Sequence, residues 1–125
     1  MAKILIAEHE DIVRNTIVKI LDRFGYETVS VATGKEALKA VEEGSLDLVL
    51  LDGDMEKGVN GIDICRKIRE THPREALPII GMSGWGAAYG QKYEEAGAND
   101  YLPKPFNIDA LREIIMRYTS DEGGN

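Results

Sequence analysis

Hydrophobic residues in this chain fall into two repeating patterns, short apolar runs and longer stretches with helical spacing. Segment 46–52 holds four consecutive aliphatic residues before Asp52, and a run that is apolar on both faces is typical of a buried central strand in a parallel sheet. The other apolar runs predict strands at 3–7, 26–32, 77–82 and 98–102. Apolar residues at helical spacing predict a helix after each strand, at 13–24, 33–44, 62–68, 89–96 and 108–118.

The predicted helices also carry local boundary signals. Thr33 and Glu36 form a capping-box pattern at the start of the second helix, and Asn107 can cap the fifth. Gly25 is the kind of residue that closes a helix, here the first. Glycines before and within the fourth helix predict that it is more mobile than the others, because glycine weakens helical structure.

Five strands that alternate with five helices imply right-handed crossovers and a parallel sheet covered by helices on both faces. We therefore predict an α/β fold, a three-layer sandwich that forms one domain over residues 1–119. Residues 120–125 show no periodicity, and we expect a flexible tail or the start of a linker there.

The charge of the chain narrows the range of partners. With 15 basic and 22 acidic side chains the formal net charge is -7, which disfavours direct binding to nucleic acids or to anionic membrane surfaces. No stretch is long and apolar enough to predict a signal peptide or a membrane span, so we expect a cytoplasmic location. The single cysteine, Cys65, lies in a helical apolar pattern that favours a core position over a reactive thiol.

Polar residues with complementary chemistry follow four of the predicted strands. Because the carboxyl ends of parallel strands meet at one edge of an open sheet, we expect them to converge. They are Glu8 and His9, Asp52 and Asp54, Ser83, and Lys104. An ionised aspartate can attack phosphorus, carboxylates can hold Mg²⁺, and a lysine and a hydroxyl can bind a phosphoryl group. An aspartate at a strand end is often only a turn former, but this convergence favours a functional Asp52.

Four segments together resemble the receiver domain of two-component response regulators over residues 3 to about 119. The segments are 6–10, 47–55 followed by Gly61, 78–84 and 100–106. The resemblance implies a flavodoxin-like, doubly wound sheet of five parallel strands in the order 2-1-3-4-5. It also implies a phosphorylation-controlled signalling domain that is not an enzyme beyond its own phosphorylation and dephosphorylation.

The same resemblance assigns roles to individual residues. Asp52 corresponds to the phosphoacceptor, Lys104 to the phosphate-binding lysine and Ser83 to the switch hydroxyl. Tyr101 corresponds to the aromatic residue that turns inward when this hydroxyl moves to the phosphate. The bond between Lys104 and Pro105 corresponds to the family's cis peptide.

The resemblance implies Mg²⁺ as the cofactor, with Glu8, His9, Asp52 and Asp54 at the metal-binding positions. His9 occupies a position that is acidic in the family, and imidazole is a poorer ligand than carboxylate for a hard cation, so weak binding is expected. Two other departures are Glu56, where a proline is usual, and a loop from Asp52 to Gly61 that is one residue longer than the commonest form. A zinc site is not expected, because the other histidine lies in a distant loop.

The sequence therefore favours a receiver domain that takes a phosphoryl group from a histidine kinase or phosphotransfer protein. We expect it to change the surface of its fourth helix, fifth strand and fifth helix, which would bind a downstream protein, a fused output domain or a second copy as a homodimer. A pseudo-receiver that binds partners without phosphorylation is one alternative, favoured by His9 and disfavoured by the presence of Asp52, Ser83 and Lys104. A weaker one is a haloacid-dehalogenase-type phosphatase, because Asp52-Gly53-Asp54 matches its DxD nucleophile pattern but closes the third strand instead of the first.

Overall fold

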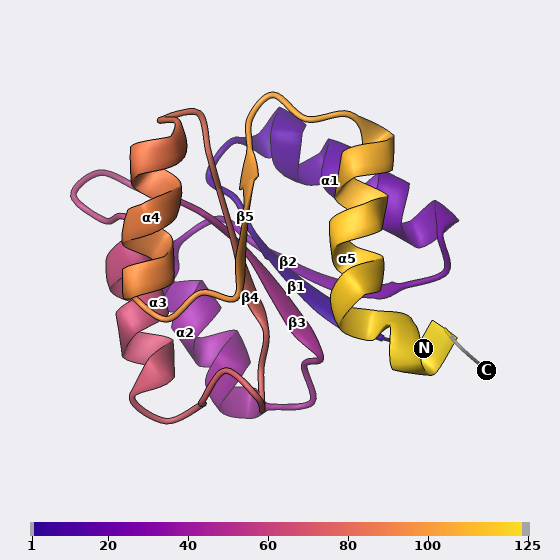
Figure 1. The fold of residues 1–125 in the computed structure, drawn as a ribbon, viewed down its shortest axis with the longest axis horizontal. Helices are drawn as coiled ribbons and strands as arrows, with labels where there is room; N and C mark the ends of the chain where they lie inside the picture. Colours follow the sequence, from indigo (N-terminus) through magenta and orange to yellow (C-terminus); the bar gives the residue numbers. More distant parts are fainter. Residues whose placement is uncertain (1, 124–125) are drawn as a thin grey trace.

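The computed structural model describes residues 2–123 and alternates strands and helices along the chain (Figure 1). The strands are β1 (Lys3–Ala7), β2 (Glu27–Val31), β3 (Leu48–Asp52), β4 (Ile79–Ser83) and β5 (Asp100–Pro103). The helices are α1 (Asp11–Arg23), α2 (Gly34–Glu43), α3 (Gly61–Arg69), α4 (Ala87–Glu95) and α5 (Ile108–Gly123). Every predicted element is present, which confirms the α/β assignment.

The strands form one five-stranded parallel sheet in the order β2-β1-β3-β4-β5. This is the flavodoxin-like order expected from the sequence. The predicted central strand, β3, pairs with β1 on one side and β4 on the other, with Leu51 opposite Ala7 and Asp52 opposite Met82. All five residues of β3 are buried, because helices cover both faces of the sheet.

The two faces of the sheet build two separate cores. Alternate residues of a strand point to opposite faces, so Leu5 and Leu51 join the core under α2, α3 and α4. Ile4 and Leu50 join the core under α1 and α5. Figure 1 shows this division, with α1 and α5 on one side of the sheet and the other three helices across it. The result is the predicted three-layer sandwich.

The residues predicted to begin and end helices have the expected capping hydrogen bonds and backbone conformation. The Thr33 hydroxyl accepts from the Glu36 amide at 3.1 Å, and the Glu36 carboxylate accepts from the Thr33 amide at 3.2 Å. Asn107 accepts from the Ala110 amide at 2.7 Å and so caps α5. Gly25 follows α1 with a φ of 89°, a conformation that residues with a Cβ rarely adopt.

Helix α5 is longer than the sequence pattern indicates. It runs to Gly123, whereas the predicted domain ends at residue 119. The division at 119 and the role of residues 120–125 stay predictions, and residues 124–125 lie outside the described part of the chain. Cys65 is fully buried, as its apolar surroundings predict. Within residues 2–123, no helix combines the length and the apolar character needed to span a bilayer.

Candidate functional site

The carboxyl ends of the strands bring the expected polar residues together. Asp52 ends β3, Ser83 ends β4, and Glu8 and Lys104 directly follow β1 and β5. They meet at a pocket of about 410 Å³ whose lining residues are His9, Glu10, Asp52, Asp54, Ser83, Gly84, Trp85 and Lys104. Glu8 is completely buried and lies beneath this pocket, not on its wall.

Lys104 links the two buried carboxylates of the site. Its Nζ lies 2.6 Å from Glu8 Oε1 and 3.2 Å from Asp52 Oδ1. The second Glu8 oxygen accepts from the Glu10 backbone amide at 3.1 Å. Asp52 is 3% exposed. Because a buried charge needs a partner and hydrogen bonds, Lys104 allows both carboxylates to remain at the sheet edge.

Burial and charge change the acid–base properties of this group. Burial, and then the charge of Glu8, raise the pKa of Asp52 to about 7, against the opposing effect of Lys104. Burial lowers the pKa of Lys104, but its hydrogen bond to Glu8 and the charge of Asp52 outweigh this and raise it overall. The site thus combines a lysine that stays cationic at neutral pH with an aspartate that can be ionised or neutral there. Such perturbed groups in a cleft are typical of functional sites.

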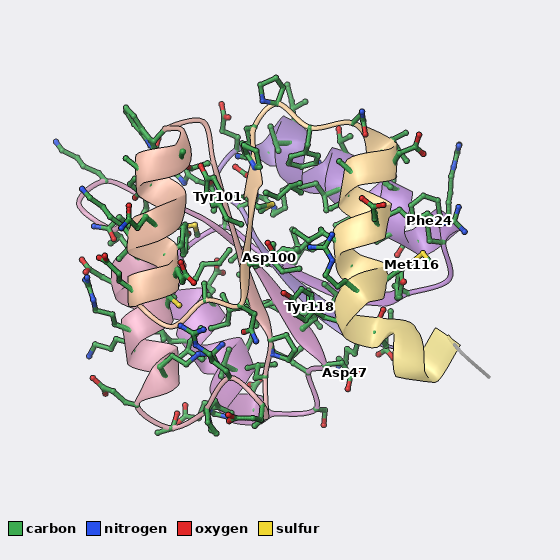
Figure 2. All side chains as sticks on the ribbon, viewed as in Figure 1. Phe24, Asp47, Asp100, Tyr101, Met116 and Tyr118 are labelled. Carbon is green, nitrogen blue, oxygen red and sulfur yellow. The ribbon has the colours of Figure 1, made fainter. Side chains whose placement is uncertain are left out.

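Ser83 and Tyr101 contact each other beside the pocket. Their hydroxyl oxygens are 2.7 Å apart, and the Tyr101 hydroxyl also donates to the Ser83 carbonyl at 3.0 Å. The Trp85 amide donates to the Ser83 hydroxyl at 3.2 Å. Tyr101 projects from β5 on the side of α4 (Figure 2), and its ring lies 6.1 Å from that of Tyr93. Ser83 thus lines the pocket and also contacts Tyr101, which lies between β5 and α4.

The residues expected to bind a metal are only partly gathered. His9 and Asp54 are exposed at the pocket, whereas Glu8 and Asp52 are buried around Lys104. In the described range 2–123, no group of three or more His, Cys, Asp or Glu side chains is positioned to hold a metal ion. Mg²⁺ is commonly bound by one or two carboxylates and several waters. Asp52 and Asp54, which both line the pocket, therefore fit Mg²⁺ with water in most of its coordination positions, whereas both Glu8 oxygens are already bonded, to Lys104 and to the Glu10 amide.

Sequence reasoning missed the residues that hold the loops around the site. Arg14 of α1 donates to the Glu8 carbonyl at 2.9 Å and to the His9 carbonyl at 3.4 Å. Tyr89 and Tyr93 of α4 also donate to backbone carbonyls of the site. A lone arginine next to an acidic loop could have been noticed, but nothing local pairs a tyrosine of α4 with a carbonyl near Asp52.

Comparison with known proteins decides the family. The family described as the response regulator receiver domain matches residues 4–116. The chain belongs to this family. It is 36% identical over 112 residues to the aerobic respiration control sensor protein ArcB of Escherichia coli K12, which covers 87% of this chain and 14% of that protein. It is also 36% identical to the transcriptional regulatory protein ResD of Bacillus subtilis, over 92% of this chain and 45% of ResD.

Solved structures agree with this family assignment. The chemotaxis protein CheY4 of Vibrio cholerae superimposes with a TM-score of 0.86 at 26% identity, over 94% of this chain and 98% of that one. NtrX of Brucella abortus has a TM-score of 0.86 at 29% identity, over 97% of this chain but 27% of NtrX. The chain spans less than half the length of ArcB, ResD or NtrX, and it matches CheY4 over nearly all of that protein. It is a signalling receiver domain of two-component systems, with the CheY-like fold.

Proposed function

We propose that this receiver domain accepts a phosphoryl group on Asp52 from a histidine kinase or a histidine phosphotransfer protein. The observation that supports this most is the position of Lys104, whose ammonium group contacts both Glu8 and Asp52 in an open pocket. A lysine in that position can move its ammonium group from the carboxylates to the negatively charged oxygens of an incoming phosphoryl group.

The chemistry uses the ionised form of Asp52. A carboxylate oxygen attacks phosphorus, and the phosphorus–nitrogen bond of the donor breaks as the new oxygen–phosphorus bond forms. The donor imidazole leaves, while Lys104 and the Ser83 hydroxyl bind the oxygens of the transferred group. Glu8, Asp52, the Asp54 backbone carbonyl and the His9 position would hold Mg²⁺, which when bound neutralises charge on these oxygens.

The donor protein is proposed to dock in an apolar groove between α1 and the start of α5. This groove has a volume of about 1010 Å³, and Lys104 lines it as well as the phosphoacceptor pocket. Ile12 and Ile108, which also line it, are 82% and 52% exposed. An exposed apolar surface that is continuous with the reactive group suits a partner that must bring a phosphohistidine to Asp52.

The output side of the domain is proposed to be the surface of α4, β5 and α5. Ser83 bonds to Tyr101 of β5, so a phosphoryl group that recruits the serine hydroxyl would release or reorient the tyrosine. A downstream protein, a fused output domain or a second receiver would bind the changed surface. Fusion to an output domain is supported by the partial coverage of ResD and NtrX. We assign this signalling to the cytoplasm on the sequence grounds given above.

Incubation with acetyl phosphate and Mg²⁺, followed by intact mass measurement, tests the phosphoacceptor directly. One phosphoryl group should be added to the parent protein and none to Asp52→Asn, whereas Asp54→Asn should keep the acceptor and serves as the matched control. Phosphate that persists on Asp52→Asn would contradict the assignment.

The same incubation tests the pseudo-receiver alternative, and a turnover assay with a phosphate ester tests the phosphatase alternative. A pseudo-receiver, which His9 favours, would stay unmodified. A dehalogenase-type phosphatase would hydrolyse a phosphate ester through many turnovers, whereas a receiver releases about one equivalent for each phosphorylation event.

A further inference from the structure

Tyrosine hydroxyls from α4 bind the backbone on both sides of Asp52. Tyr93 donates to the Leu51 carbonyl at 2.7 Å, and Tyr89 donates to the Gly53 carbonyl at 3.1 Å. The residues of each pair are 42 and 36 positions apart in the sequence. Helix α4 is therefore bonded directly to the end of the central strand, independently of Ser83 and Tyr101.

Glycines create the space in which these tyrosines sit. A Cβ atom on Gly53 would overlap the Tyr89 ring, and one on Gly81 would overlap the Tyr93 ring. The two tyrosine rings pack edge to face, with centroids 5.8 Å apart, and Tyr93 is completely buried. Because interiors are close-packed, the Tyr93 hydroxyl has little freedom to bond another acceptor. Tyr89 is half-buried, and the contact of its ring with Gly53 places its hydroxyl at the Gly53 carbonyl.

The Tyr89 hydroxyl bonds to the Gly53–Asp54 peptide group, which lies just after the phosphoacceptor Asp52. The Gly53 carbonyl accepts two hydrogen bonds, from the Tyr89 hydroxyl and from the Gly61 amide at 3.0 Å. The Gly53 amide donates to the Met82 carbonyl at 2.7 Å. A peptide group is planar, so fixing the Gly53 carbonyl also fixes the direction of the Asp54 amide on the same plane. Asp54, whose amide belongs to this peptide group, lines the phosphoacceptor pocket.

We propose that Tyr89 is a positioning residue for phosphoryl transfer, which acts by holding the Gly53–Asp54 peptide beside Asp52. This inference rests on the proposed phosphoacceptor function. Leu51 lies within β3 and is already paired with both neighbouring strands, so the Tyr93 bond adds less local order. Gly53 lies just after β3, outside the strand pairing, and the Tyr89 hydroxyl supplies one of the two hydrogen bonds that hold its carbonyl.

The bond also connects the site to α4. A partner that displaces α4 would remove the Tyr89 hydroxyl from Gly53 and loosen the acceptor loop. Linkage then requires that, at equilibrium, phosphorylation of Asp52 changes the affinity of that partner by the same factor as the partner changes the equilibrium for phosphorylation. Tyr89 thus provides a route between phosphorylation and α4 that remains when Ser83 is replaced.

Tyr89→Phe keeps the ring on Gly53 and removes only the hydroxyl. The matched control is Tyr118→Phe, whose hydroxyl donates to the Asn99 carbonyl at 3.1 Å and to Asp100 at 3.0 Å, between α5 and β5 (Figure 2). Both variants lose tyrosine hydrogen bonds, so a merely structural role would affect their stabilities in urea similarly. Only Tyr89→Phe should slow phosphorylation by acetyl phosphate, roughly three- to tenfold.

Nuclear magnetic resonance supplies a second measurement that does not depend on phosphorylation. In Tyr89→Phe the amide signals of Gly53 and Asp54 should shift and relax faster, whereas in Tyr118→Phe they should match the parent protein. Parent-like rates and parent-like amide signals in Tyr89→Phe would overturn the positioning role and leave the phosphoacceptor function intact. Failure of the parent protein to become phosphorylated would instead reject the function, and the amide signals alone would then decide whether Tyr89 orders the loop.

Discussion

Replacing Asp52 by Asn should stabilise the receiver domain, even though it removes the proposed phosphoacceptor. Burial and the charge of Glu8 raise the pKa of Asp52 from 3.8 to about 7. The folded chain therefore holds a proton on Asp52 that the unfolded chain has already released between these pH values. The stability contributed by a group with a raised pKa is fully present below 3.8 and is lost as the pH rises towards 7.

The size of the effect follows from the same pKa values. A change from 3.8 to about 7 corresponds to a loss of about 4 kcal/mol once the pH exceeds 7. The amide of Asn resembles the neutral acid and avoids this loss. Water in the open pocket and the loss of one partner for Lys104 reduce the gain, so Asp52→Asn should be about 2 to 4 kcal/mol more stable at pH 8. Near pH 4.5 the difference should fall to about 1 kcal/mol.

Urea unfolding followed by far-ultraviolet circular dichroism measures this difference at each pH. The comparison of Asp52→Asn with the parent cancels the titration of carboxylates that both proteins share. Asp54→Asn is the matched control, because Asp54 is exposed and its replacement should change stability by less than about 0.5 kcal/mol. An Asp52→Asn protein that is less stable than the parent at pH 8, or a difference that does not change with pH, would refute the reasoning.

Further predictions concern the switch, the metal position and the donor groove. Ser83→Ala should still be phosphorylated but should lose the activated-state chemical shifts around Tyr101, and their persistence would rule out the hydroxyl switch. His9→Asp should bind Mg²⁺ more tightly by about 1 kcal/mol or more in calorimetry, whereas equal affinity would show that residue 9 is not a ligand. Ile12→Glu should slow transfer from a phosphorylated histidine donor by about tenfold and leave acetyl phosphate transfer unchanged. Met116→Glu, at another exposed apolar position, is its control, and equal slowing of both would remove the groove from the donor interface.

Several features of the site depended on information that no local pattern contains. The sequence indicated that Glu8 and Lys104 approach Asp52, but not that Glu8 lies fully buried with its carboxylate on the lysine. Burial depends on how the loops after β1 and β5 close over the sheet. The raised pKa of Asp52 follows from that burial, so it could not be foreseen from residue types alone. The bonds of Tyr89 and Tyr93 to β3 and its following loop have the same origin.

The fourth helix illustrates the difference between local propensity and tertiary packing. Its glycines predict a weak helix, and Gly90 lies within α4, which is continuous from Ala87 to Glu95. In the folded domain this glycine leaves room for the Tyr101 ring, which a Cβ atom at residue 90 would overlap. A residue that lowers helix propensity thus permits a close contact between α4 and β5. The sequence shows the lower propensity, and only the packed structure shows the reason for it.

By itself the sequence determined the order of strands and helices, the parallel sheet, and the edge at which Asp52, Ser83 and Lys104 meet. These features follow from the spacing of apolar residues over a few positions and from the handedness of strand–helix–strand units. The tertiary structure decided which carboxylate Lys104 contacts most closely, which groups lose water, and which hydroxyl reaches which carbonyl. Those outcomes depend on distances of a few ångströms between segments far apart in the chain, and such distances are set by the packing of the two cores.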